Sequence, residues 1–303
     1  MAFDLSMELM HATVQLEQPL GDGTRTVGTG FLIEAPTPDG KPRVVLITAN
    51  HVFERMPGPE ARIGYRIANP DGSWTYAPQP LKIRDDKGGE LWTHHPSRDV
   101  AAITITAPEA FAKAAIPEGW LADGDTFAKD GVGAGDEMMA LGFPRGLAAN
   151  QAGFPILRSG RVASYPVAPA DIYPTFLLDF SVFPGNSGGP VFMTGQAWRH
   201  QVRAAGEAGA DAAARTGAPA AGAPSEAPMV GPDGQPEFIA GLLTQQVELN
   251  SERLEIGIVT HAKFIRETIA RLDDPNAPVT LARDETDPGT ARAASATEAL
   301  APE

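Results

Sequence analysis

Short apolar runs separated by turn residues dominate this chain, and they constrain its fold more than any other feature. From Ala12 onward, runs rich in Val, Ile, Leu and Phe alternate with clusters of Gly, Pro, Asp and Asn. The chain has 32 Gly and 28 Pro among its 303 residues. Their combined share of about 20% is well above the average of about 12%. Runs of this length between such turns are typical of β-barrels and β-sandwiches. We therefore expect an all-β protein.

The predicted strands fall into two groups with a polar, Ala-rich connection between them. The first group covers residues 12–17, 28–35, 43–49, 61–67 and 100–106, and the second covers residues 138–143, 156–165, 176–183, 190–193, 238–247 and 256–259. After the last run, His261, Ile265, Ile269 and Leu272 recur at helical intervals, which predicts a terminal helix over residues 260–272. We expect two β units, residues 7–115 and 135–272, joined by a linker over residues 116–134.

Two segments are not expected to pack. Residues 195–236 contain 13 Ala, 7 Gly and 5 Pro, so burial of their side chains cannot offset the entropy lost on ordering them. We predict a flexible insert between two strands of the second unit. Residues 273–303 carry seven acidic residues, two Arg and scattered Pro, which predicts a disordered acidic tail.

Charge and cysteine content exclude several classes of function. The chain has 24 Lys and Arg against 38 Asp and Glu, a formal net charge of −14, so we expect no nucleic-acid partner. It has no Cys, which excludes disulfides, thiolate nucleophiles and Cys-ligated zinc. No apolar stretch reaches the roughly 18 residues of a membrane span, and we expect no membrane partner. Asp4 and Glu8 stand where a signal peptide needs a basic start and an apolar run, so we predict a cytoplasmic location.

Three windows carry side chains suited to nucleophilic catalysis. His51 ends the apolar run at residues 44–52, Asp99 leads directly into another run, and Ser187 lies within the sequence PGNSGGP at residues 184–190. Each has an ordinary structural explanation when taken alone: a His at a strand end, an Asp in a turn, and a Gly-rich turn. However, Gly residues around a nucleophilic Ser allow backbone N–H groups to converge on a developing oxyanion.

In this order, the motifs TANHV, DVAAI and GNSGGP resemble the chymotrypsin-like (trypsin-fold) serine peptidases, particularly the bacterial branch that includes the HtrA/Deg protease domains. The segments GTGFLI, GDEMMALGFP, SGRVAS, IAGLLTQQ and IGIVTHAKFI agree with this resemblance, which covers roughly residues 7–272. It implies two six-stranded antiparallel β-barrels with a C-terminal helix, here without a PDZ domain.

The resemblance also implies roles for individual residues. Ser187 is the nucleophile, His51 its general base, and Asp99 orients the imidazole and stabilises its cation. The backbone N–H groups of Gly185 and Ser187 would form the oxyanion hole. Thr244 occupies the position of a Ser that hydrogen-bonds the triad Asp in the family, and its hydroxyl is expected to do the same. The implied activity is a serine endopeptidase that acts through an acyl-enzyme intermediate.

The chain departs from the family pattern at several positions. Asn186 replaces the Asp that pairs with a newly cut N-terminus, so activation by propeptide cleavage is not expected. The floor of the primary specificity pocket is expected near Ser181, with Thr244 and Gln246 beside it. The absence of a carboxylate there argues against Arg or Lys specificity. Gln246 replaces a common Gly and is expected to narrow the pocket. The implied partner is a peptide or protein substrate, and a regulatory protein partner remains open.

We expect neither a cofactor nor a metal. His94 and His95 are adjacent, but no third His or Cys stands at ligand spacing, so we expect them in a solvated loop and the activity to be indifferent to chelators. Two alternatives remain at this point. The first is an α/β-hydrolase, because residues 185–189 also fit G-x-S-x-G, although that fold requires the order Ser, acid, His. The second is a catalytically silent binding module with a peptidase-like double barrel.

Overall fold

The alternation of apolar and turn residues produces two β units, described by a computed structural model for residues 4–194, 236–249 and 252–280. The first unit is an eight-stranded sheet with the order β5-β4-β1-β2-β3-β7-β6, in which β8 pairs with β2. Its strands are β1 (Thr13–Pro19), β2 (Arg25–Pro36), β3 (Pro42–Thr48), β4 (Glu60–Ala68), β5 (Trp74–Lys82), β6 (Thr93–His94), β7 (Ala101–Ile105) and β8 (Ile116–Pro117). All of these pairings are antiparallel except the one between β2 and β8.

The second unit is a closed antiparallel barrel with the order β10-β11-β14-β13-β12-β9. Its strands are β9 (Glu137–Gly142), β10 (Ile156–Val162), β11 (Thr175–Asp179), β12 (Pro190–Met193), β13 (Phe238–Leu249) and β14 (Glu252–His261). Closure removes the exposed strand edges that an open sheet would leave.

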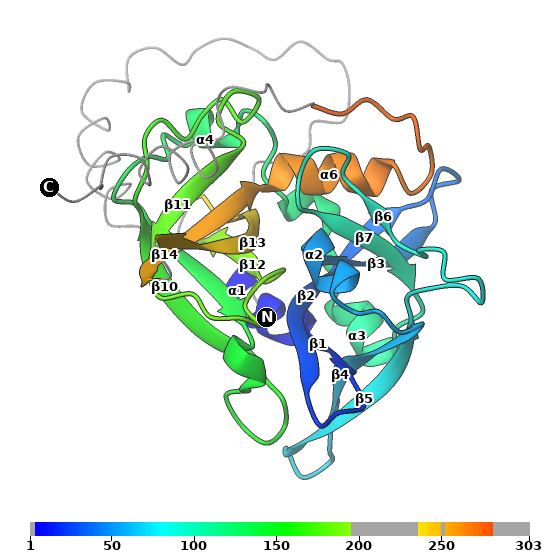
Figure 1. Ribbon diagram of the computed structural model, residues 1–303. Coiled ribbons are helices and arrows are strands. Elements are labelled where there is room, and N and C mark those ends of the chain that lie inside the picture. The colour runs from blue at the N-terminus through cyan, green and yellow to red at the C-terminus, as the bar shows by residue number, and fades with distance from the viewer. Residues whose placement is uncertain (1–3, 195–235, 250–251, 281–303) are drawn as a thin grey trace, which may run out of the picture.

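Short helices connect and cover the two units. They are α1 (Leu5–Ala12), α2 (Asn50–Glu54), α3 (Glu109–Ala114), η1 (Glu118–Trp120), α4 (Thr126–Lys129), η2 (Pro144–Gly146) and α6 (Ala262–Ala270). Figure 1 shows the units side by side with α6 above their junction, and α6 contacts β7 of the first unit as well as β13 and β14 of the second. No helix in the described part of the chain is long and apolar enough to cross a membrane.

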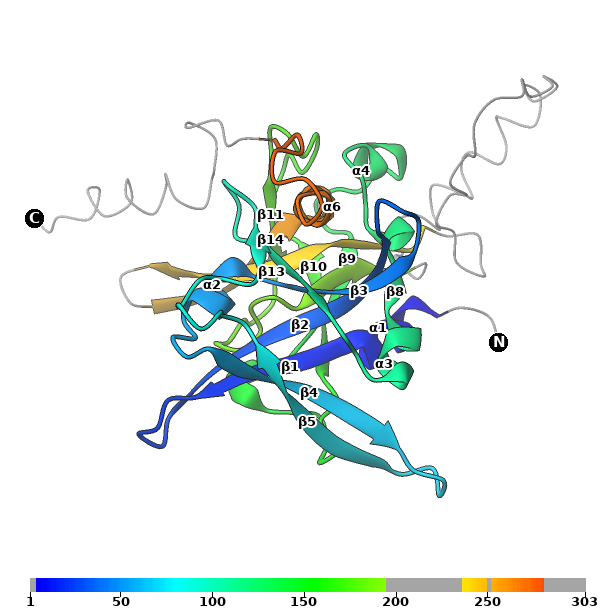
Figure 2. The same cartoon turned by 90° about the vertical axis from the view of Figure 1, so that its right-hand side faces the viewer.

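The predicted all-β fold with a C-terminal helix is confirmed, and the second barrel has the expected six strands. For the first unit the expected six-stranded barrel is corrected: it is an eight-stranded sheet, because the short strands β6 and β8 are added to it. Strand β5 was not expected, since Pro78 and Pro80 interrupt its sequence. Figure 2 shows it as the outer strand of a long hairpin with β4, and proline is tolerated at a sheet edge. The antiparallel strands exclude the α/β-hydrolase alternative.

The predicted insert connects two strands that lie next to each other in the second barrel. Met193 at the end of β12 pairs with Phe238 at the start of β13, so the connection joins direct neighbours, as expected. Of the insert itself, residues 195–235 lie outside the described residues. The predicted tail is described only for residues 273–280, which make specific contacts: Arg43 on β3 binds both carboxylate oxygens of Asp273, at 2.7 and 2.6 Å. The disordered tail predicted from residue 273 is therefore corrected for these eight residues.

One apolar core runs through both units. Phe31 of β2 and Phe192 of β12 are both fully buried within it. A charged side chain, Arg66 of β4, is also buried, with 1% of its surface exposed. Its guanidinium donates to the carbonyl of His11 at 2.7 Å, of Thr13 at 2.8 Å and of Gly153 at 3.0 Å. Arg66 therefore ties the end of α1 and the loop before β10 to the first sheet.

Replacing Arg66 with Met is expected to destabilise the protein by about 3 kcal/mol, because the carbonyls that the guanidinium satisfies would stay buried without a donor. Burial lowers the pKa of Arg66 to about 10, so the side chain is cationic at neutral pH. It lies against the last carbonyls of α1, where a cation is favourable. Urea unfolding would measure the change, and Arg66→Lys should recover only part of it. A Met variant as stable as wild type would contradict this role.

Candidate active site

The register between β3 and β7 brings His51 and Asp99 together. Thr48, the last residue of β3, pairs with Ala101, the first residue of β7. Asp99 comes two residues before Ala101, and His51 lies in the first turn of α2, three residues after Thr48. The Asp99 carboxylate accepts the His51 backbone N–H at 2.9 Å through one oxygen and lies 2.6 Å from His51 Nδ1 through the other.

This pair of contacts fixes the chemistry available to the imidazole. A carboxylate only accepts hydrogen bonds, so Nδ1 carries the proton and Nε2 keeps its lone pair as an acceptor. The second bond, to the His51 backbone, stops the carboxylate from rotating away from the ring. His51 and Asp99 are both partly exposed, at 21% and 34% of their side-chain surface. Among the described residues, Nε2 of His51 has no hydrogen-bond partner, so it is available as a base at the surface.

The segment before Ser187 forms a turn that orients backbone donors. The N–H of Asn186 donates to the carbonyl of Phe183 at 3.0 Å, and Gly185 has a φ of +97°. A turn with Pro at its second position and a positive φ at its third is of type II. The carbonyl of Pro184 accepts the N–H of Arg145 at 2.6 Å. Because C=O and N–H point in opposite directions in a trans peptide, this bond directs the N–H of Gly185 away from Arg145.

Within the described residues, the N–H groups of Gly185 and Ser187 donate no hydrogen bond to the protein. Two backbone donors are therefore available beside the Ser187 hydroxyl. Arg145 itself adopts a left-handed conformation, with φ of 53°. The sequence did not reveal this residue as a support of the turn.

Thr29 of β2 connects the first sheet to both sides of Ser187. Its hydroxyl donates to the carbonyl of Gly185 at 2.7 Å, and its N–H donates to the carbonyl of Ser187 at 2.9 Å. It also accepts the N–H of Phe143 at 3.1 Å. Sequence reasoning missed this residue, although the Thr stands between two Gly residues in the motif GTGFLI. A side chain at Gly188, where φ is +86°, would lie 2.1 Å from the carbonyl oxygen of Thr29. The approach of the two units at the Ser therefore depends on this Gly.

The Ser187 hydroxyl donates to the carbonyl of Thr244 at 3.2 Å. The described residues include no hydrogen bond between Ser187 and His51. The expected bond from the Thr244 hydroxyl to Asp99 is also absent there, which corrects that prediction: this hydroxyl donates to the carbonyl of Ile258 at 3.2 Å. Thr244 is 5% exposed and lies on β13 beside β14, so its side chain finds a partner inside the second barrel. Its main chain, not its side chain, faces the nucleophile.

Arg158 of β10 lies beside the expected specificity pocket. Its guanidinium donates to the carbonyl of Ser181 at 3.1 Å and lies over the ring of Phe183 at 5.2 Å. The guanidinium of Arg145 contacts the same ring, at 5.4 Å. A cation, Arg158, therefore contacts Ser181, the residue expected at the floor of the specificity pocket. Gln246 lies on β13, but its side chain lies outside the described residues.

The two adjacent histidines have different environments. His94 is exposed as expected, whereas His95 is 2% exposed and bonded to Glu267. The prediction of a solvated loop is therefore wrong for His95, because α6 covers that part of the loop. In the described ranges, no three His, Asp or Glu side chains form a group suited to a metal ion.

A family model of the trypsin-like peptidase domain matches residues 28–199, which include His51, Asp99 and Ser187. The chain belongs to this family. The match extends over both units and contains the serine turn and the strands that hold His51 and Asp99 in place.

Two similar solved structures are those of the HtrA-type protease AlgW with a tripeptide, one of them a point variant. They have 16% and 15% sequence identity, with TM-scores of 0.46 and 0.47, and the matches cover 90% and 91% of this chain. The chain spans only 64% and 65% of their length. This likeness is too distant to indicate a substrate. No curated protein sequence matches the chain significantly.

Replacing Gly185 with Ala is expected to lower the rate of reaction at Ser187 by about 100-fold or more, the usual effect of losing one oxyanion donor. The new Cβ would lie 2.3 Å from the carbonyl oxygen of Phe143, and Ala disfavours the positive φ. The turn would have to shift. Gly72→Ala is the matched control, because Gly72 has φ of +84° but a Cβ added there would meet no atom within 4 Å. Labelling of Ser187 by a fluorophosphonate measures both rates, and equal losses would contradict the role of the turn.

Proposed function

We propose that this member of the trypsin-like peptidase family is a serine endopeptidase with His51, Asp99 and Ser187 as its catalytic residues. The observation that carries the proposal is the double hydrogen bond from His51 to Asp99, which leaves Nε2 as a free base beside the serine turn. The substrate class is a peptide or protein. The predicted cytoplasmic location stays a prediction.

The proposed reaction follows from these positions. Ser187 Oγ attacks the scissile carbonyl carbon while His51 Nε2 takes the hydroxyl proton. The N–H groups of Gly185 and Ser187 bind the oxyanion. The C–N bond then breaks, His51 returns the proton to the leaving amine, and an acyl-enzyme forms. Water then attacks the ester carbonyl carbon while His51 takes its proton. The C–O bond to Ser187 breaks, and His51 returns that proton to Ser187 Oγ as the acid is released. In this reaction the Ser187 hydroxyl first exchanges its bond to the Thr244 carbonyl for a bond to His51.

One observation favours the second candidate, a catalytically silent binding module. The Ser187 hydroxyl is bonded to a main-chain carbonyl and not to the base. Without a hydrogen bond to His51, the Ser187 hydroxyl is a weak nucleophile. The two candidates differ in whether Ser187 reacts with an electrophile.

Covalent labelling by a fluorophosphonate distinguishes them, because the probe requires an activated serine. We expect one label per molecule, located at Ser187 by mass spectrometry. Asp99→Asn should slow labelling by about 10,000-fold, since it leaves the imidazole in the wrong tautomer. Ser159→Ala, which removes an exposed serine on β10, should label like wild type. Absence of label on the wild-type protein would favour the binding module.

A further inference from the structure

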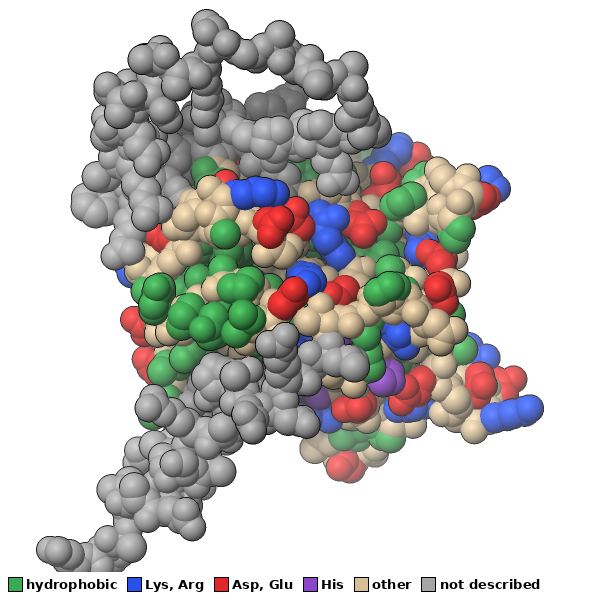
Figure 3. Space-filling model, turned by 90° about the horizontal axis from the view of Figure 1, so that it is seen from above, with side chains coloured by type: hydrophobic (Ala, Val, Ile, Leu, Met, Phe, Trp, Pro, Cys, Tyr) green, Lys and Arg blue, Asp and Glu red, His purple; other side chains and the backbone are tan. Residues whose placement is uncertain are grey.

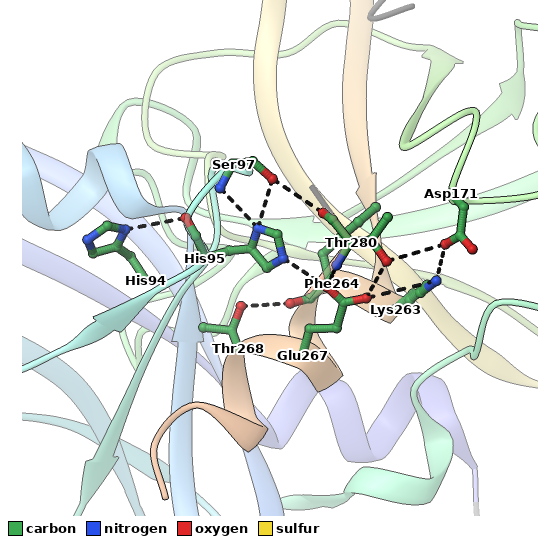
Figure 4. A network of polar contacts seen from close by, with 9 residues as sticks. All are labelled: His94, His95, Ser97, Asp171, Lys263, Phe264, Glu267, Thr268 and Thr280. Carbon is green, nitrogen blue, oxygen red and sulfur yellow. Dashed lines mark hydrogen bonds and ion pairs between the residues drawn. The ribbon is translucent and has the colours of Figure 1, made fainter. Parts of the chain in front are cut away.

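A buried network joins the loop that carries Asp99 to helix α6. His95 lies between β6 and β7, and none of its side-chain surface is exposed. Its Nε2 is 2.9 Å from Glu267 Oε2 on α6, and its Nδ1 accepts the N–H of Ser97 at 3.2 Å. Because Nδ1 accepts, the ring proton is on Nε2 and is donated to the carboxylate. Figure 4 shows the imidazole between Ser97 and Glu267.

The carboxylate of Glu267 holds a second segment in place. Thr280 donates to it through its N–H and through its hydroxyl, both at 2.8 Å, and the Thr280 carbonyl accepts the hydroxyl of Ser97 at 3.4 Å. We call His95, Ser97, Glu267 and Thr280 the His95 clamp. Every member bonds to at least one other, so the loop, the helix and the chain after the helix are tied together.

Hydrogen bonds within the clamp keep Glu267 ionised. Burial by itself would raise the pKa of Glu267, but hydrogen bonds from His95 and Thr280 lower it below its ordinary value. Lys263 lies 3.9 Å from the same carboxylate and also contacts Asp171. Figure 3, which views the molecule from the side of α6, shows acidic and basic side chains interspersed over the middle of this face. The clamp thus keeps its negative charge at neutral pH.

The loop that carries His95 and Asp99 is a short turn that packs against α6. The N–H of His95 donates to the carbonyl of Val100, and the N–H of Val100 donates to the carbonyl of Arg98, both at 2.9 Å. Phe264 of α6 packs against the His95 ring at 5.4 Å and the Arg98 guanidinium at 5.3 Å. Asp99 lies inside this turn, with its carboxylate bonded to His51. His95 and Asp99 therefore lie in one short turn, bonded to Glu267 through His95 and to His51 through Asp99.

We propose that His95 and Glu267 are positioning residues that hold Asp99 against His51 across the junction of the two units. This inference rests on the proposed function and deepens it. Asp99 and His51 belong to the first unit, whereas Ser187 and α6 belong to the second unit in sequence. The clamp fixes the acid relative to the unit that carries the nucleophile. The Thr280 contacts make the chain after α6 part of that arrangement.

The test compares fluorophosphonate labelling rates and their pH dependence for the full chain and four variants. His95→Phe keeps the ring and removes both bonds, and Thr280→Val removes one bond to Glu267. His95→Gln is the conservative variant, since an amide offers a donor and an acceptor at a similar spacing. Thr268→Val is the matched control: Thr268 is fully buried on α6, but its hydroxyl donates to the carbonyl of Phe264 in its own helix, at 2.6 Å. Each variant is assayed well below its melting temperature.

We expect His95→Phe to slow labelling about 10-fold, Thr280→Val to slow it less, and His95→Gln to recover most of the rate, because small misplacements of a catalytic group are costly. The labelling rate should fall at low pH. The pH at which it reaches half its maximum should be lower in His95→Phe, since a displaced Asp99 stabilises the His51 cation less. Hydrogen bonds from His95 and Thr280 hold the pKa of Glu267 below its ordinary value, so the acid midpoint of the wild-type protein does not report its titration. In an Asp99→Asn background, His95→Phe should cause no further loss.

Three results would overturn the inference while leaving the proposed function intact. The first is a labelling rate of His95→Phe equal to that of Thr268→Val. The second is an unchanged midpoint of the labelling rate at low pH. The third is a further 10-fold loss of labelling rate when His95→Phe is added to Asp99→Asn. If the wild-type protein itself is not labelled at Ser187, the proposed function fails first. A lower melting temperature with unchanged rate and midpoint would show that the clamp only stabilises the fold.

Discussion

Ser187→Ala is expected to lower peptide cleavage by about a million-fold, the scale at which removal of the nucleophile acts in a serine peptidase. The Thr244 hydroxyl is bonded to the carbonyl of Ile258 inside the barrel, so it is not expected to replace the Ser187 hydroxyl. The effect on folding should be small. The Ser187 hydroxyl makes one hydrogen bond, at 3.2 Å to the carbonyl of Thr244, and such a bond contributes only about 1 kcal/mol. Proteome-wide identification of new N-termini, comparing wild type with the variant, would measure the loss and identify the cleavage preference.

His51→Ala should be nearly as damaging, and the double variant no worse than either single one, because the residues act as a unit. Cleavage by Ser187→Ala at the wild-type rate would contradict the assignment of the nucleophile. Equal melting temperatures of wild type and variant would show that the loss is one of chemistry. The profile also tests the pocket: with Arg158 beside Ser181, cleavage sites should not favour Arg or Lys.

His261 is expected to make the protein labile to acid. The residue ends β14 with 2% of its surface exposed, and its ring contacts Phe127 at 4.5 Å and Phe176 at 5.0 Å. Burial lowers its pKa to about 3, against 6.5 for a free imidazole. The unfolded chain therefore binds a proton at a pH where the folded protein does not. The contribution of His261 to folding stability is fully present above about pH 6.5 and is lost as the pH falls from there toward 3, by about 5 kcal/mol in all.

Urea unfolding at a series of pH values, for wild type and His261→Phe, isolates this contribution. Phe keeps an aromatic ring against Phe127 and Phe176 but binds no proton. Other groups contribute equally to both proteins, so the difference in unfolding free energy between them should change by about 5 kcal/mol between neutral pH and pH 3. A difference that stays constant with pH would show that His261 takes up its proton without unfolding.

Local patterns in the sequence were sufficient for the strands that carry the site. Most predicted strands match within a few residues, because β-branched runs between turn residues have few alternatives to a strand. Strand β5 escaped prediction, since its two prolines are acceptable only at a sheet edge, and edge position is a property of the whole sheet. The buried environment of His95 was missed for a similar reason: the helix residues that cover it lie far along the chain, in α6.

The sequence by itself determined the family, the all-β class and the three candidate catalytic residues, because each of these depends on motifs read within a few consecutive residues. Only the tertiary structure decided how the residues meet. It placed Thr29 of the first sheet on both sides of Ser187, turned the Thr244 hydroxyl into the barrel, and connected His95 to Glu267. These are contacts between distant segments, and their geometry depends on strand register and on the packing of one unit against the other, which no local pattern encodes.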